Sequence, residues 1–419
     1  PAVVAPVSPL TLTDIRAAEK PPQPVAPRAL ADALSAMNQL DEKDPARADK
    51  LYNLARLHAE HERYFRFQAA ALTENLKGLM AAGTPEAELR ETRAELSEAE
   101  QKRWRWLESA TKRYTELTTN PLFAQFRRMD LALVSLITLQ LMQKQEEEAR
   151  PVVKRLLAEF PETLSLPDAL LAFGEYFWEA GDVDKALTFY ERILGYPAAT
   201  RWSYARYKAG WCRFTKKEWQ PAMNDFVAVT RKALGKVVEG DDVEDPAKKS
   251  GELLVASAAR AAVWTYAQAG GADKAWAFLG NVDAARTVER MEQLAGDYAL
   301  LGKRAEQSET FRQLAQKSQA DPPQRCEWQA RALELGDGGE LDRERLAALK
   351  ELVDIAHEVA MNLKLDEAAQ KGCAEATTAA LAPALSRLLA SLRKADAETI
   401  AAALALVTTY RQHVAPAAD

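Results

Sequence analysis

Hydrophobic residues recur every three or four positions from about residue 28 to the end of the chain, with polar residues between them. This spacing marks one face of an α-helix, so the pattern predicts a succession of amphipathic helices and no strands. The most apolar run, residues 131–142, is shorter than the roughly 20 residues that a membrane-spanning helix needs. We therefore expect this run to form a buried helix.

Two long helices are predicted before residue 125. Asp44-Pro45 has the form of a helix cap followed by a first-turn proline, and Gly83-Thr84-Pro85 breaks the pattern before a second helix that ends near Thr119. Apolar residues of this second helix follow a seven-residue spacing, at Leu89, Leu96, Ala110 and Leu117. The pattern predicts an antiparallel hairpin with coiled-coil-like packing.

From about residue 130 the chain repeats itself. Ala149, Ala186 and Ala222 are 37 and 36 residues apart, and Ala275 begins a similar register. Glycine precedes two of these alanines by five residues, at Gly181 and Gly270. An aromatic residue also precedes a bulky residue by 13 positions in three segments: Phe177 and Tyr190, Tyr266 and Leu279, and Tyr298 and Phe311. Small residues permit close helix crossings, and the bulky pairs fill the wedge between repeats.

The segment Phe173-Gly-Glu-Tyr-Phe177, followed by Gly181, Ala186, Tyr190 and Pro197, resembles the tetratricopeptide repeat family. Gly210-Trp-Cys212 with Ala222 and Phe226 repeats the same motif. The resemblance implies an all-α fold, an α-solenoid of helix pairs. It gives five repeats, at residues 130–163, 167–200, 203–236, 256–287 and 288–322.

Composition divides the chain into four predicted regions. Residues 1–27 contain seven prolines and are expected to form an extended tether. Residues 28–125 form the long hairpin region, 126–325 the repeat array, and 326–419 a helical bundle that caps the array. Residues 235–251, rich in acidic residues and glycine, are expected to be a solvated loop, with a partner-contacting loop as the alternative.

Charge argues against a nucleic-acid partner, because 55 basic and 61 acidic residues give a net charge of −6. Residues 102–114 interleave basic and aromatic side chains, but glutamates on the same helix favour an ion-paired helix face, with a protein contact as the alternative. The three cysteines, Cys212, Cys326 and Cys373, are far apart in the sequence and are expected to be buried thiols.

No constellation of catalytic residues is apparent in the sequence. His58 and His61 lie three residues apart without a third metal ligand nearby, and no nucleophile elbow, phosphate loop or dinucleotide fingerprint is present. We therefore expect a protein that is not an enzyme and has no cofactor and no metal.

The sequences of residues 49–58, 172–178 and 204–214 are similar to those of repeat proteins of deltaproteobacterial cell envelopes, some of which belong to gliding-motility machinery. The resemblance implies a protein–protein interaction scaffold whose partners are envelope or motility proteins, with only indirect membrane contact. A structural spacer at the outer membrane or cell wall, without a groove, is the alternative. With the Pro-Ala leader and the absence of an initial Met, we expect a periplasmic or outer-membrane-associated protein; a cytoplasmic one is the alternative.

In tetratricopeptide proteins the first helix of each pair lines the concave face. Carrying that register onto this chain places Asp168 and Leu171 on the face and predicts nine partner-binding residues: Glu175, Trp178, Glu179, Tyr204, Tyr207, Trp211, Phe214, Arg260 and Trp264. Tetratricopeptide proteins that bind a C-terminal carboxylate use Lys, Arg and Asn at such positions, and among these residues only Arg260 is of that kind. The aromatic set with its carboxylates favours an apolar or basic extended segment. The alternative is that Trp211 and Phe214 pack between repeats.

Overall fold

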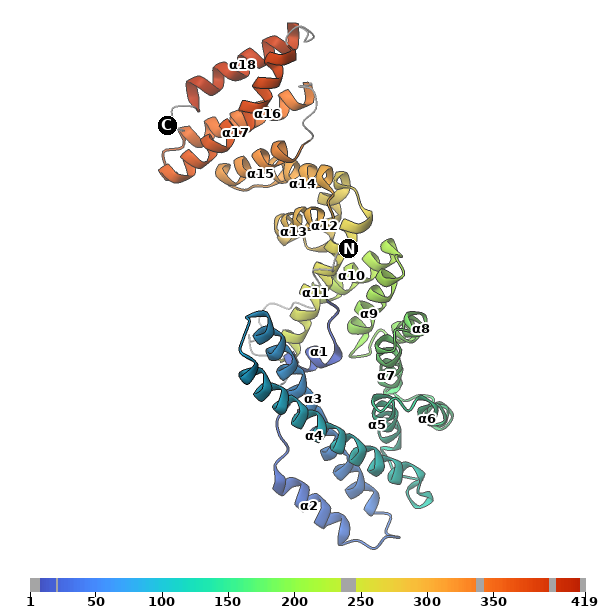
Figure 1. The fold of residues 1–419 in the computed structure, drawn as a ribbon. Coiled ribbons are helices and arrows are strands. Elements are labelled where there is room, and N and C mark those ends of the chain that lie inside the picture. Colours follow the sequence, from blue (N-terminus) through green and yellow to red (C-terminus); the bar gives the residue numbers. More distant parts are fainter. Residues whose placement is uncertain (1–7, 20–21, 235–245, 337–342, 392–396, 415–419) are drawn as a thin grey trace. The chain divides into compact units, whose positions relative to one another are not determined.

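The computed structural model describes residues 8–19, 22–234, 246–336, 343–391 and 397–414. Within these ranges the regular structure is entirely helical (Figure 1), which confirms the predicted all-α class. None of the helices in these ranges is both long and apolar enough to cross a membrane. The chain divides into two compact units, which are described separately: an N-terminal unit, Pro9–Ala258, and a C-terminal unit, Ala259–Asp419 together with Pro1–Ser8. The division falls near the start of the predicted fourth repeat, residues 256–287.

The N-terminal unit begins with a short helix, α1 (Leu12–Glu19), inside the segment that was expected to be an extended tether. That expectation is wrong for these residues because Thr11 and Asp14 cap the helix reciprocally. The Thr11 N–H donates to Asp14 Oδ2 over 2.7 Å, and the Asp14 N–H donates to Thr11 Oγ1 over 3.2 Å. A second helix, α2 (Pro27–Asn38), starts at the last tether residue.

The predicted long hairpin is confirmed as α3 (Arg47–Ala81) and α4 (Glu86–Thr119), which pack along each other. Leu107, Ala110 and Leu117 are fully buried in it. The basic and aromatic stretch of residues 102–114 is ion-paired, as expected: Lys102 binds Glu98, and Arg103 binds Glu62 and Glu100. This stretch is therefore part of the hairpin's own surface.

Three helix pairs follow the hairpin in the N-terminal unit and match the first three predicted repeats (Figure 1). They are α5 (Met129–Met142) with α6 (Glu146–Glu159), α7 (Leu166–Glu179) with α8 (Val183–Leu194), and α9 (Trp202–Thr215) with α10 (Trp219–Leu234). The predicted loop at residues 235–251 lies mostly outside the described residues. Its last part belongs to α11 (Pro246–Ala269).

Glycine sets the distance between the two helices of a pair. A Cβ atom on Gly174 would lie 2.6 Å from the Tyr190 ring, and one on Gly210 would lie 2.7 Å from the Phe226 ring. Both rings are fully buried. The small residue of the first helix therefore lets an aromatic side chain of the second helix lie flat against its backbone.

In four of the five predicted helix pairs, the turn contains a left-handed residue at one fixed position. These residues are Lys144 (φ 60°), Gly181 (78°), Lys217 (62°) and Gly302 (68°), each five residues before the small-residue position of the second helix. Gly270 has the same position in the fourth pair, but its φ is not positive. A lysine in this conformation is strained by about 1–2 kcal/mol. Because Gly302 keeps this register, the structure supports a fifth helix pair although Gln307 replaces the small residue.

The C-terminal unit contains the end of α11 and seven further helices (Figure 1). They are α12 (Ala275–Val282), α13 (Thr287–Leu300), α14 (Arg304–Lys317), α15 (Pro322–Leu335), α16 (Arg343–Met361), α17 (Glu367–Ser391) and α18 (Ala397–His413). The predicted boundary at residue 326 falls inside α15, which packs against both α14 and α16. Helix α15 therefore joins the last predicted repeat to the C-terminal helices.

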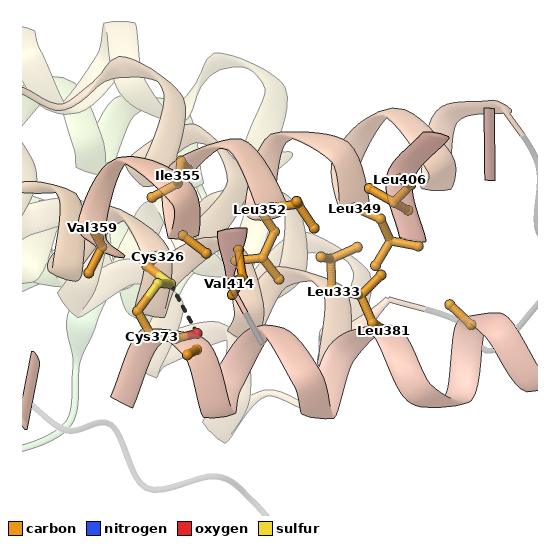
Figure 2. Close-up of a cluster of buried hydrophobic side chains, with 14 of the residues drawn as sticks. Cys326, Leu333, Leu349, Leu352, Ile355, Val359, Cys373, Leu381, Leu406 and Val414 are labelled. Carbon is orange, nitrogen blue, oxygen red and sulfur yellow. Dashed lines mark hydrogen bonds between the residues drawn. A yellow bond between two sulfur atoms is a disulfide. The ribbon is translucent and has the colours of Figure 1, made fainter. Parts of the chain in front are cut away.

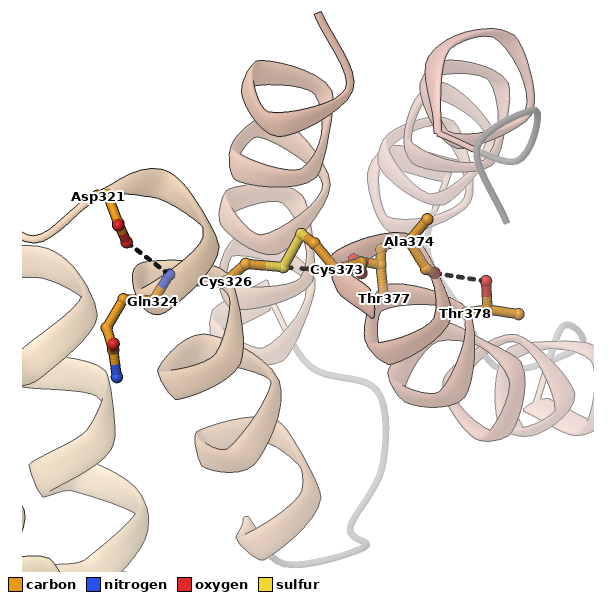
Figure 3. The surroundings of a disulfide bond; sticks show 7 residues. All are labelled: Asp321, Gln324, Cys326, Cys373, Ala374, Thr377 and Thr378. Atoms are coloured by element: carbon orange, nitrogen blue, oxygen red, sulfur yellow. Dashed lines mark hydrogen bonds between the residues drawn. A yellow bond between two sulfur atoms is a disulfide. The ribbon is translucent and has the colours of Figure 1, made fainter. Parts of the chain in front are cut away.

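A disulfide joins Cys326 of α15 to Cys373 of α17, so the prediction of three free thiols is wrong for this pair. Sequence distance gave no signal for it, because the two cysteines meet only when α15 and α17 pack, with Cα atoms 5.9 Å apart. Asp321 caps α15 by accepting the Gln324 N–H over 3.1 Å (Figure 3). Leucine, isoleucine and valine side chains surround the bridge (Figure 2). Cys212 is free and buried, as expected.

Candidate functional site

A cavity of about 620 Å³ opens inside the N-terminal unit. Its walls come from α3 of the hairpin, from α5 and α7, the first helices of two successive pairs, and from residues 11–13 of the N-terminal segment. First helices lining a concave surface are what the repeat register predicted. The participation of the hairpin and the N-terminal segment was not predicted.

Helix α7 contributes the wall that the sequence anticipated most closely. Asp168, Leu171, Glu175 and Glu179 are spaced by three or four residues and all line the cavity. The opposite face of α7 is buried against α8 through Phe173 and the Gly174–Tyr190 contact, and this packing fixes the rotation of the helix. Trp178 is not on the wall; it is half-buried, with the Lys208 ammonium 4.6 Å from its ring centre.

The walls on α3 and α5 differ in chemistry. Helix α3 presents arginine and glutamate in turn, and Arg56 forms an ion pair with Glu60 while Arg66 lies 3.5 Å from Glu62. Helix α5 presents apolar and hydroxyl side chains: Leu131, Val134, Ser135, Thr138 and Met142. One side of the cavity is therefore polar with its charges already paired, and the other is apolar.

The carboxylate of Glu175 connects three helices at the edge of the cavity. It accepts hydrogen bonds from the hydroxyls of Tyr190 (2.5 Å) and Tyr204 (3.0 Å), and it lies 3.5 Å from the ammonium of Lys208. Lys208 is 1% exposed, so Glu175 supplies the opposite charge that a buried ammonium requires. The cluster ties α7 to α8 and α9 and holds Tyr204 in a fixed orientation.

Burial determines the protonation of this cluster. Desolvation, and then the charge of Glu175, raise the pKa of Tyr190 and Tyr204 well above its ordinary value, so both hydroxyls keep their protons. Desolvation and then the Glu175 charge also raise the pKa of the Glu179 carboxyl, although part of that side chain faces solvent. The tyrosines thus remain neutral hydrogen-bonding groups.

Tyr204 and Tyr207 are both buried, and a stretch of the chain's own N-terminal segment covers them. The Leu10 N–H donates to the Tyr207 hydroxyl over 3.1 Å, and the Tyr204 hydroxyl lies 3.4 Å from the Leu10 carbonyl. A few residues on, Ile15 is 3% exposed. The face predicted for a partner's extended segment is therefore covered here, at Tyr204 and Tyr207, by the chain's own residue Leu10.

The remaining predicted groove residues do not face a free surface. Trp211 is 3% exposed and packs edge-on against Tyr207 and Phe226, while Phe214 is half-buried against Trp211 and Trp219. The ring contacts of Trp211 lie within its own helix pair, α9 and α10, whereas the alternative prediction placed it between repeats. It is a core residue in this structure.

In the C-terminal unit, two residues predicted to line the groove make interior contacts instead. Trp264 is 2% exposed within α11. Arg260 forms a bidentate ion pair with the buried Asp297, with Nη1 2.6 Å from Oδ2. The guanidinium that fitted a carboxylate clamp therefore already holds a carboxylate of α13.

No His, Cys, Asp and Glu cluster among the described residues has the three or more members that a metal ion would need. His58 and His61 instead pack against the Trp106 ring, with centroids 5.2 Å and 4.3 Å away. Desolvation lowers the pKa of both imidazoles, which favours their neutral forms in the hairpin.

No protein-family model matches the chain, and neither does any curated protein sequence. Among solved structures, it is similar to the crystal structure of a tetratricopeptide repeat protein from Parabacteroides merdae ATCC 43184 at 2.39 Å resolution. The two are 14% identical over 74% of this chain and 98% of that chain, with a TM-score of 0.32. The helix pairs of this chain, with their fixed turn and glycine contacts, themselves define its class as a tetratricopeptide-like array.

Proposed function

We propose that this protein is a non-enzymatic scaffold that binds an extended segment of another protein in the cavity of its N-terminal unit. The observation that supports this is the N-terminal segment: Leu10 uses its main-chain N–H and C=O groups toward Tyr207 and Tyr204, and the next three residues, 11–13, line the cavity. Main-chain contacts of this kind are open to any extended segment, and the cavity walls then select among side chains.

We further propose that the protein works in a bacterial cell envelope, with envelope or motility proteins as partners. The buried Cys326–Cys373 disulfide supports this location, because disulfides persist in oxidising compartments and are rare in the cytosol. Trapping thiols with an alkylating agent in intact native cells tests it. A cell population in which both cysteines are alkylated would contradict an envelope location and favour the cytoplasm.

Filling the cavity is expected to abolish partner binding. Ala172 lines the cavity, so Ala172→Trp places an indole where a partner's side chains would enter. Ala158 is exposed on α6, and Ala158→Trp adds the same group outside the cavity. In affinity capture with mass spectrometry, we expect at least one protein to be recovered equally by the wild type and Ala158→Trp, but at least tenfold less by Ala172→Trp.

The same experiment separates the scaffold from the spacer alternative. Circular dichroism should show equal helicity and melting for both variants, so that a difference in capture reports on binding alone. If all three proteins recover the same partners in the same amounts, the cavity is not the binding site. A spacer without a groove would then be the better account.

A further inference from the structure

We infer that residues 9–15 are an intramolecular ligand of the cavity and compete with the partner, whose segment shares their chemistry. Residues 9–13, Pro-Leu-Thr-Leu-Thr, are uncharged and combine apolar with hydroxyl side chains. Asp14, the charged residue of 9–15, is exposed and caps α1. The partner class is therefore a segment whose residues at the site are uncharged, as residues 9–13 are. This inference rests on the proposed function and adds the partner's chemistry and its regulation.

The contacts of the segment resemble those of a bound peptide. Leu10 is held through both of its main-chain polar groups by Tyr207 and Tyr204, which lie three residues apart near the start of α9. The Thr11–Asp14 cap then turns the chain into α1, and Ile15 is buried beyond the cap. An extended stretch followed by a buried apolar anchor gives the segment a defined register in the groove.

The segment occupies the site incompletely. Thr11, Leu12 and Thr13 are themselves part of the cavity wall, and about 620 Å³ remains open beside them. A partner that pairs with the same tyrosines and also places larger side chains in this space would bury more surface than the chain's own segment does. Such a partner can displace residues 9–15, because apolar burial favours the better-filling ligand.

The charges of the walls disfavour an anionic ligand. Arg56 is paired with Glu60, Arg66 with Glu62, and Lys208 with Glu175. An anionic ligand would have to break one of these pairs or remain unpaired in a partly desolvated space, and the Glu179 carboxylate of the wall would repel it. Hydroxyl groups, by contrast, find partners in Ser135 and Thr138 of the wall, and main-chain groups find partners in Tyr204 and Tyr207 beside it.

The test measures binding of a fluorescently labelled peptide with the sequence of residues 8–15 to the full-length chain by anisotropy. Ile15→Asp puts a charge at a buried position and is expected to expel the chain's own segment. We expect the peptide to bind Ile15→Asp at least tenfold more tightly than the wild type. Leu10→Pro, which removes the N–H that Tyr207 accepts, should act in the same direction. Leu34→Asp, at an exposed leucine of α2, should leave the affinity unchanged.

A second substitution identifies the site. In the Ile15→Asp chain, Tyr207→Phe keeps the ring but removes the hydroxyl, and it should lower peptide affinity severalfold with unchanged melting. Equal affinity of the wild type and Ile15→Asp for the peptide would overturn the competition while leaving the groove in place. If neither binds the peptide but partner capture still depends on position 172, the inferred partner chemistry is wrong. Failure of both experiments would overturn the proposed function itself.

Discussion

Reduction of the Cys326–Cys373 disulfide is expected to lower the free energy of unfolding of the C-terminal unit by about 4 kcal/mol. The bridge links residues 47 positions apart, and its loss lets the unfolded chain explore many more conformations. Both cysteines lie in the core that joins α15, α16 and α17 (Figure 2). A change of about 1.36 kcal/mol in free energy changes an equilibrium constant tenfold. The slowest amides of these helices should therefore exchange with deuterium up to about a thousandfold faster under reductant.

The N-terminal unit supplies a control in the same sample. Its cysteine, Cys212, is free and buried, so the amides of α9 should exchange at the same rate with and without reductant. The double variant Cys326→Ala with Cys373→Ala should reproduce the effect of the reductant on α15–α17. If reductant leaves exchange in these helices unchanged, the bridge does not stabilise the unit as we expect.

Phe226→Ala is expected to lower the stability of the N-terminal unit by about 3–5 kcal/mol. The ring is fully buried, lies against the backbone at Gly210, and makes edge contacts with Tyr207 and Trp211. Its removal leaves a cavity that the two rigid helices cannot close. Urea denaturation followed by circular dichroism should show this loss as a shift of the first unfolding transition to a lower urea concentration.

A double-mutant cycle tests whether Gly210 and Phe226 form one packing unit. Gly210→Leu alone should also destabilise, by about 1–3 kcal/mol, because its side chain meets the Phe226 ring. Combined with Phe226→Ala, the leucine has space to occupy, so the double variant should be more stable than the sum of the two losses predicts. Strict additivity would mean that the two residues do not share the contact seen here.

The helix pairs were predictable because their signals are local. The small residue, the turn residue and the bulky residue lie within one repeat, and their spacing reflects contacts made across a single helix crossing. The register of α7 followed from the same signals, so Glu175 and Glu179 could be placed on the concave face. Lys144 and Lys217 show the limit of the turn signal, because lysine gives no hint of a left-handed conformation.

The rest of the site depends on contacts between distant parts of the chain. The charges of α3 look like any solvated helix face, and no pattern in the sequence shows that they line a cavity with α5. Leu10 meets Tyr204 and Tyr207 across almost 200 residues through main-chain groups, which carry no sequence signal. Trp211 and Trp264 were placed by family register alone, and their burial depends on how closely neighbouring helices pack.

The central claim is that the cavity between α3, α5 and α7 receives an extended segment. The most direct measurement uses the peptide of residues 8–15 with p-benzoylphenylalanine in place of Leu12, photo-crosslinked to the Ile15→Asp chain and mapped by mass spectrometry. We expect crosslinks within Arg47–Ala81, Met129–Met142 and Leu166–Glu179, reduced by an excess of unlabelled peptide. Crosslinks confined to α6 and α8, or insensitive to that excess, would contradict the claim.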